Sequence, residues 1–188
     1  LHLCHHNLES IDTTSMTTHD LLLEVCMAAK YEGQSIRDYY TIYKETNPGT
    51  ASQLCTVLAR SFADIGDIVR GKDLFYGNPQ EKEKREDLEK KLKGIFKKIH
   101  GGSTNGELKT RYDGDGDNFY QLREDWWTAN RHTVWEAITC NAQGNTYFRA
   151  TCGSGKTATR TPSQCRCEGA KGANVVPTYF DYVPQFLR

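Results

Sequence analysis

Apolar residues recur every three or four positions in four long stretches of the chain, with polar residues between them. This period is typical of helices that bury one face against a core. The four predicted helices cover about Thr17–Thr46, Thr50–Gly71, Asn78–Gly102 and Asn118–Thr139.

The third helix carries the clearest start signal. Asn78 is placed to cap it, Pro79 suits its first position, and Glu81 follows three residues after the cap. Beyond this helix, the stretch from Gly101 to Gly116 is rich in Gly, Ser, Thr and Asp, so we expect a loop there.

Residues Cys140–Asn174 show no helical period and hold four of the seven cysteines. We expect an irregular segment held by disulfides, with a short strand at Thr146–Phe148. The predicted fold class is therefore mostly α: a helical bundle with a disulfide-pinned irregular segment. The length suits one domain.

Seven cysteines in 188 residues favour disulfides and an oxidising compartment, although composition alone also allows a reduced protein with buried thiols. Because seven is odd, at least one thiol is free or pairs outside the chain. The spacing does not match the paired ligands of structural zinc sites. The last four cysteines allow three pairings among themselves, and sequence does not choose between them. The disulfide candidates are Cys4, Cys26, Cys55, Cys140, Cys152, Cys165 and Cys167.

The net charge is zero, since 24 Lys and Arg residues balance 24 Asp and Glu residues. Any attraction to a charged partner must therefore come from local patches. No apolar run is long enough to cross a bilayer, and the first ten residues lack a signal-peptide pattern, so we expect no direct membrane insertion.

Two local groups of cationic residues stand out, one on the third predicted helix and one in the cysteine-rich segment. Such groups suit a sulfated glycan, although a solvated helix face and soluble loops explain them equally well. Nucleic acid is disfavoured because aromatic residues are not interleaved with the charges. The candidate glycan-binding residues are Lys90, Lys91, Lys93, Lys97, Lys98, Lys156, Arg160 and Arg166.

Two loops imitate cofactor sites. Gly153–Thr157 resembles a phosphate loop, but Ala150 stands where the motif needs its first glycine, and Pro162 follows where a helix is required. We therefore favour an exposed basic loop over nucleotide binding.

The second imitation is Asp113–Glu124, which places carboxylates at positions 1, 3, 5 and 12 of a calcium loop. Asn118 occupies the position of the required glycine, and no helix is predicted before the loop. An acidic turn with Asn118 as a helix cap is favoured over a calcium site. We expect no metal and no cofactor.

No arrangement of a nucleophile with a base and an oxyanion site is visible, so we predict that the protein is not an enzyme. Trp126 and Trp127 are adjacent, and neighbouring helical residues point about 100° apart. Core packing is therefore a better account of this pair than a platform for a sugar or a cation.

Charged residues interleave with the apolar stripe of the second helix at Arg60, Asp64, Asp67 and Arg70. Their spacing of three or four residues allows opposite charges to meet. We expect these residues to form an ionic outer face on a core helix.

Four blocks of sequence together resemble one known family. They are CTVLARSFADIGDIVRG at Cys55–Gly71, AAKYEG at Ala28–Gly33, LREDWW at Leu122–Trp127 and PTYFDYVPQFLR at Pro177–Arg188. Their content and order resemble the alpha type of Duffy-binding-like domain found in erythrocyte membrane protein 1 of Plasmodium falciparum.

The resemblance implies an extracellular adhesion domain of a membrane protein on the infected red cell, which binds red-cell or endothelial receptors and is recognised by host antibodies. The alternative is a scaffold fragment whose receptor contacts lie on the missing subdomains. The alpha type is associated with sulfated glycosaminoglycans, blood-group sugars or complement receptor. Residues 1–188 would form the central portion of one domain, mainly its second subdomain, without most of the flanking subdomains. The family's N-terminal subdomain carries cysteines, which makes Cys4 the candidate for pairing outside the chain.

Overall fold

A computed structural model of the chain describes residues 18–46, 54–74, 78–102, 106–153, 155–167 and 176–188. These residues form no β-strand, which confirms the mostly α class. None of their helices has an apolar stretch that could span a membrane. The helices are α1 (Thr18–Thr46), α2 (Leu54–Arg70), α3 (Pro79–Gly102), α4 (Gly106–Tyr112) and α5 (Tyr120–Ile138), with the short 3-10 turns η1 (Gly116–Asn118), η2 (Gly155–Thr157), η3 (Phe180–Tyr182) and η4 (Gln185–Leu187).

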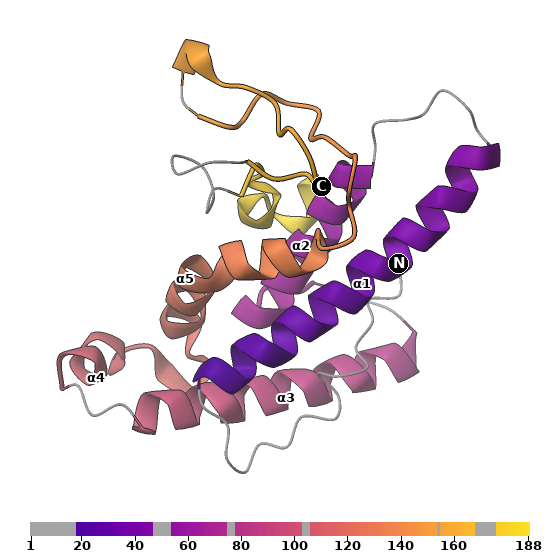
Figure 1. The fold of residues 1–188 in the computed structure, drawn as a ribbon. Coiled ribbons are helices and arrows are strands. Elements are labelled where there is room, and N and C mark those ends of the chain that lie inside the picture. Colours follow the sequence, from indigo (N-terminus) through magenta and orange to yellow (C-terminus); the bar gives the residue numbers. More distant parts are fainter. Residues whose placement is uncertain (1–17, 47–53, 75–77, 103–105, 154, 168–175) are drawn as a thin grey trace.

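Helix α1 crosses α2 and α5, and α3 lies below α1 at the bottom of the view (Figure 1). The crossing of α1 and α5 depends on Gly33, because a Cβ atom there would overlap the carbonyl group of Ile138. The 3-10 turn η3 packs on α2. Two helices and the end of the chain therefore meet around α2.

Aromatic side chains fill the space between these helices. Trp127 and Trp135 of α5 lie 5.1 and 5.2 Å from the ring of Phe62 on α2, measured between ring centroids. Trp126 turns instead toward α3, where its ring meets Phe96 edge-on at 6.2 Å. Both residues of the Trp126–Trp127 pair are buried, so core packing is the correct account.

The start of α3 is as predicted, since the backbone N–H of Glu81 donates to Oδ1 of Asn78 at 2.9 Å. The predicted loop after α3 is partly wrong, because α4 forms within it. A helix of seven residues is marginal alone. Arg111 and Tyr112 at its end each donate to Oδ2 of Asp125 on α5 at 2.8 Å, and these tertiary bonds stabilise α4.

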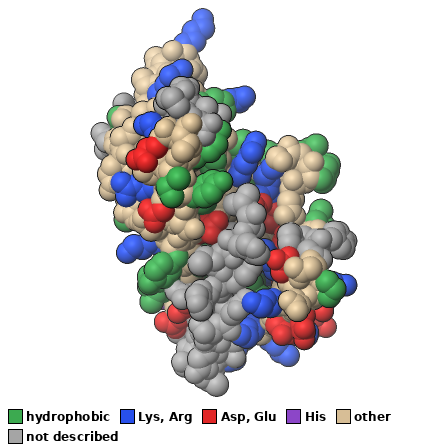
Figure 2. Space-filling view, turned by 90° about the vertical axis from the view of Figure 1, so that its right-hand side faces the viewer, with side chains coloured by type: hydrophobic (Ala, Val, Ile, Leu, Met, Phe, Trp, Pro, Cys, Tyr) green, Lys and Arg blue, Asp and Glu red, His purple; other side chains and the backbone are tan. Residues whose placement is uncertain are grey.

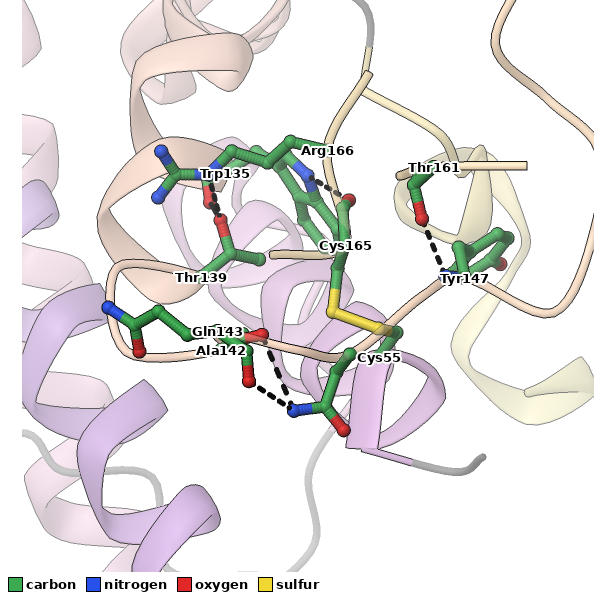
Figure 3. Close-up of a disulfide and its surroundings, with 10 residues drawn as sticks. Cys55, Trp135, Thr139, Ala142, Gln143, Tyr147, Thr161, Cys165 and Arg166 are labelled. Carbon is green, nitrogen blue, oxygen red and sulfur yellow. Dashed lines mark hydrogen bonds between the residues drawn. A yellow bond between two sulfur atoms is a disulfide. The ribbon is translucent and has the colours of Figure 1, made fainter. Parts of the chain in front are cut away.

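The cysteine-rich segment is irregular, as expected, and only one of its two disulfides is internal. Cys152 pairs with Cys167 within the segment. Cys165 pairs with Cys55 of α2 (Figure 3). Figure 3 also shows the indole of Trp135 donating to the carbonyl of Cys165, at 3.2 Å. One disulfide thus attaches the segment to the helical core.

Two further expectations about this region need correction or completion. No strand forms at Thr146–Phe148; instead the N–H of Tyr147 donates to the hydroxyl of Thr161 at 2.7 Å. Cys26 and Cys140 form no disulfide, and Cys4 lies outside the described residues. Burial and the charge of Glu136 raise the pKa of Cys26 to about 11, so its thiol stays protonated and unreactive at neutral pH.

The two disulfides should differ in their contribution to stability. Cys55 and Cys165 are 110 residues apart, whereas Cys152 and Cys167 are 15 apart. Replacing Cys55 and Cys165 by alanine should lower the free energy of unfolding by about 4–5 kcal/mol, and replacing Cys152 and Cys167 by about 3 kcal/mol. Urea denaturation of the complete oxidised domain measures both, and a larger loss from the second pair would contradict this order.

Candidate functional site

Asp181 of η3 is a buried carboxylate, only 1% exposed, that three donors from α5 surround. It accepts from the indole Nε1 of Trp127 at 2.9 Å and from two guanidinium nitrogens of Arg131 at 2.7 and 2.8 Å. Burying a charge is costly unless it is paired and hydrogen-bonded. These bonds satisfy Asp181 and fix η3 against α5.

Arg70 lies at the end of α2, is 2% exposed, and contacts both α5 and η3. Its guanidinium donates to Oδ1 of Asp67 at 2.9 Å and to Oε1 of Glu124 on α5 at 3.2 Å. It also donates to the backbone carbonyl of Asp181. One side chain therefore connects α2, α5 and η3.

Arg188 brings the last residues of the chain onto α2. It donates to Asp64 at 2.9 Å, to Asp67, and to the carbonyl of Val183 at 2.8 Å. Burial raises the pKa of Asp64 and of Asp67 above the ordinary 3.8, although the charge of Arg188 opposes that rise.

The expected ionic outer face of α2 is therefore only partly correct. Asp67 and Arg70 do pair, but both are buried, and the nearest partner of Asp64 comes from the end of the chain. Arg60 alone of the four remains exposed. The spacing within α2 showed which charges could meet but could not show that distant residues would cover them.

Arg123 of α5 connects α3 to the end of α2 and is completely buried. Its guanidinium binds both carboxylate oxygens of Glu89 at 2.7 and 2.8 Å, and donates to the carbonyls of Val69 and Ile68 at 2.6 and 3.0 Å. Gly71 has a φ of +71°, and a Cβ there would lie 2.8 Å from a guanidinium nitrogen of Arg123. Only glycine fits this position.

We call the six buried or nearly buried charged residues of this network the ionic core: Asp67, Arg70, Arg123, Arg131, Asp181 and Arg188. Five of the six belong to the sequence blocks that carry the family resemblance. These blocks therefore have a structural role that explains their polar residues.

The loop that imitates a calcium site uses its carboxylates for other contacts. Asp115 accepts from the N–H groups of Gln121 and Leu122 at 2.8 and 2.9 Å, so it caps α5 in place of Asn118, the cap we predicted. Glu124 pairs with Arg70 and Lys72. In the described ranges, no group of three or more His, Cys, Asp or Glu side chains is placed to hold a metal ion.

The loop that imitates a phosphate site forms the tip of a hairpin. Cys152 and Thr159 pair across it, and the 3-10 turn η2 lies between them. Ser154 lies outside the described residues. No long helix follows within the described part, so the amide arrangement of a nucleotide site is lacking there.

The cationic candidates fall into two groups that the structure keeps apart. Lys90, Lys91, Lys93, Lys97 and Lys98 lie on the second half of α3, whereas Lys156 and Arg160 are exposed on the hairpin. Figure 1 places the hairpin at the end of the molecule opposite α3, and Figure 2 shows basic side chains at that tip. The two groups form no single patch.

Arg166 differs from the other candidates because its guanidinium is engaged. It donates to the hydroxyl of Thr139 at 2.7 Å (Figure 3). It also donates to the backbone carbonyl of Glu136, at the end of α5. A cation at a helix C-terminus is stabilising. Its contacts give Arg166 a role in the fold.

On α3, the lysines differ in their pairing. Lys90 lies 3.1 Å from Asp87, and Lys93 lies 3.8 Å from Glu89. Lys97 and Lys98 are exposed. Lys90 and Lys93 border a groove of about 470 Å³. No sequence signal pointed to this groove, because part of its lining comes from the end of α2 and from Tyr120, which are distant in the sequence from α3.

Comparisons with known proteins agree with this arrangement. The model of the Duffy binding domain family matches residues 1–188, so the chain belongs to that family. No curated protein sequence matches it.

Three solved structures show the likeness in detail. The NTS-DBL1(alpha-1) domain of Plasmodium falciparum membrane protein 1 (PfEMP1) from the varO strain is 42% identical, with a TM-score of 0.75 over 99% of this chain and 40% of that one. The varO double domain of NTS-DBL1-alpha and CIDR-gamma is also 42% identical, with a TM-score of 0.76 over 99% and 25%. The P. falciparum PfEMP1 IT4var13 DBLbeta domain bound to ICAM-1 is 32% identical, with a TM-score of 0.67 over 99% and 40%.

The predicted resemblance to the alpha type of Duffy-binding-like domain is therefore confirmed. The chain spans 40% or less of the length of these three structures.

Removing the carboxylate of Asp181 tests the ionic core. Asp181→Asn leaves Arg131 nearly buried without its anion, so the free energy of unfolding should fall by roughly 3–5 kcal/mol. Chemical denaturation of the complete domain measures the loss. The control Asp117→Asn changes an exposed residue and should stay within about 0.5 kcal/mol of the original protein. Equal effects from the two variants would contradict this role.

Glu124 should make stability depend on pH. Burial alone would raise its pKa, but the hydrogen bonds and charges of Lys72 and Arg70 outweigh burial and lower it below the ordinary 4.5. Its contribution is therefore fully present above pH 4.5 and is lost as the pH falls through the lowered value. Glu124→Gln should cost roughly 1.5–3 kcal/mol at pH 7 and progressively less in acid.

Urea denaturation at several pH values measures this difference. Glu83→Gln, at an exposed position of α3, is the matched control and should show no such dependence. A cost of Glu124→Gln that stays constant from pH 7 into acid would contradict the assignment.

Proposed function

We propose that this chain is the central portion of one Duffy-binding-like domain, mainly its second subdomain, within an adhesin on the surface of the infected red cell. The domain binds host cell-surface receptors and makes or breaks no covalent bond. Family membership supports this proposal, as does a related DBLbeta domain that has been solved bound to ICAM-1.

One observation carries the assignment of the binding surface. Five charged residues of the family blocks are buried or nearly buried in the ionic core, whereas the lysines of α3 lie at the surface. Residues 89–102 of α3 include five lysines and a single carboxylate, Glu89. That surplus of positive charge suits an anionic ligand, and among the receptors expected from the family it favours a sulfated glycosaminoglycan.

The hairpin is the second exposed cationic surface, with Lys156 and Arg160 at its tip. Its two cationic residues provide less charge than α3. We propose that α3 is the main glycan-binding element and that the hairpin contributes little. Blood-group sugars and complement receptor would have to bind without this charge complementarity.

Heparin affinity of the complete domain tests this proposal. Exposed charges each contribute about 0.5–1 kcal/mol, so reversing Lys90, Lys93 and Lys97 to glutamate should weaken binding about tenfold or more. The matched control reverses Lys156 and Arg160 and should change affinity by much less. Binding should also weaken with salt, because the charges are exposed.

Two outcomes would contradict the proposal. Failure of the unmodified domain to bind heparin near physiological salt would refute the glycan as ligand. Unchanged binding after reversal of the three α3 lysines would refute the choice of helix.

A further inference from the structure

A groove of about 470 Å³ lies where the end of α2 meets α3 and the first residue of α5. Ile68 and Leu88 give it apolar lining, and Tyr120, which is 48% exposed, stands beside it. Lys82, Lys90 and Lys93 border it from α3. Apolar walls with a few placed polar groups are typical of sites for small ligands and single sugar units.

The groove also contains carboxylates, but arginines hold two of them. Arg85 pairs with Asp73 at 2.9 Å, and both side chains are mostly buried. The buried Arg123 binds both oxygens of Glu89. Arginines therefore compensate the negative charges of Asp73 and Glu89, which leaves the positive charge of the lysines in excess.

The lysines themselves are loosely paired. The ammonium groups of Lys82 and Lys93 lie 3.9 and 3.8 Å from Glu86 and Glu89, beyond hydrogen-bonding distance. The pair of Lys90 with Asp87 is shorter, 3.1 Å, but both side chains are exposed. Exposed pairs of this kind contribute about 1 kcal/mol or less, so an anion with better geometry can displace them.

A row of lysines on one face of α3 extends beyond the groove. Lys90, Lys93 and Lys97 are three and four residues apart, so they share one face of α3. About 10 Å of helix separates Lys90 from Lys97, at 1.5 Å per residue. A single anion cannot reach both ends of this row, whereas a chain with several anionic groups can.

We propose that this groove binds one sulfated sugar unit of a glycan chain, with Lys90 and Lys93 donating to sulfate oxygens and Tyr120 packing against the sugar ring. The chain continues from the groove over Lys97. This inference rests on the proposed function. It narrows the proposed binding site from the whole lysine-rich helix to one side of that helix.

Charge-matched variants of the complete domain test the groove. Lys90→Gln with Lys93→Gln removes two charges from the groove, and Lys84→Gln with Lys109→Gln removes two exposed charges outside it, one on another side of α3 and one on α4. Binding to a heparin-derived oligosaccharide is measured by calorimetry, with circular dichroism as a check on folding. The groove variant should bind about tenfold or more weakly, and the control variant within about twofold of the original.

A third variant, Tyr120→Ala, leaves the charge unchanged. It should weaken binding of the sulfated oligosaccharide several-fold through loss of the aromatic contact, an effect that charge alone does not explain. Chemically desulfated oligosaccharide should bind weakly to the original protein and to all variants.

The outcomes separate the groove from the function on which it rests. Equal losses in the two lysine variants, or binding that survives both, would overturn the groove while leaving glycan binding intact. Unchanged binding by Tyr120→Ala would overturn the sugar contact and with it a seated sugar unit. No binding by the original domain would overturn the proposed glycan function and the groove together.

Discussion

Asp181 places a carboxylate inside the protein, between the indole of Trp127 and the guanidinium of Arg131, and the positions of three elements depend on it. A buried charge of this kind is tolerated only when its partners are complete. Arg70 adds a bond to the backbone of the same residue. The 3-10 turn η3 is thereby fixed against α5 and α2, although some 50 residues separate it from α5 in the sequence.

A second buried arginine, Arg123, connects α3 to the other helices in the same way. Arg123 reaches Glu89 on α3 and the last carbonyls of α2, while Trp126 packs on Phe96. The inner side of α3 is therefore fixed by the ionic core and the aromatic residues. Its outer side is free to vary in charge without disturbing the fold, and a receptor-binding surface benefits from that separation of scaffold and contact residues.

Much of this fold could be predicted from the sequence. The apolar period located α1, α2, α3 and α5, and the cap at Asn78 fixed the start of α3, because these are local signals. The burial of Trp126 and Trp127 also followed from their helical spacing.

The errors concern contacts between distant residues. Asp67 and Arg70 appeared to be surface charges because their partners, Arg188 and Asp181, are more than 100 residues away. Cys165 pairs with Cys55, outside the segment in which its partner was sought. The short helix α4 is stabilised by Asp125 on another helix, a contact that the composition of its own loop does not encode.

Hydrogen–deuterium exchange of the complete domain, with and without a heparin-derived oligosaccharide, tests most directly whether scaffold and binding surface are separate. We expect slow exchange at the end of α2 and through α5 in both states, because the ionic core surrounds these segments. Added oligosaccharide should slow exchange on α3 around Lys90–Lys97 and leave Phe180–Tyr182 unchanged. Protection of Phe180–Tyr182 by the ligand, with no change on α3, would contradict the account.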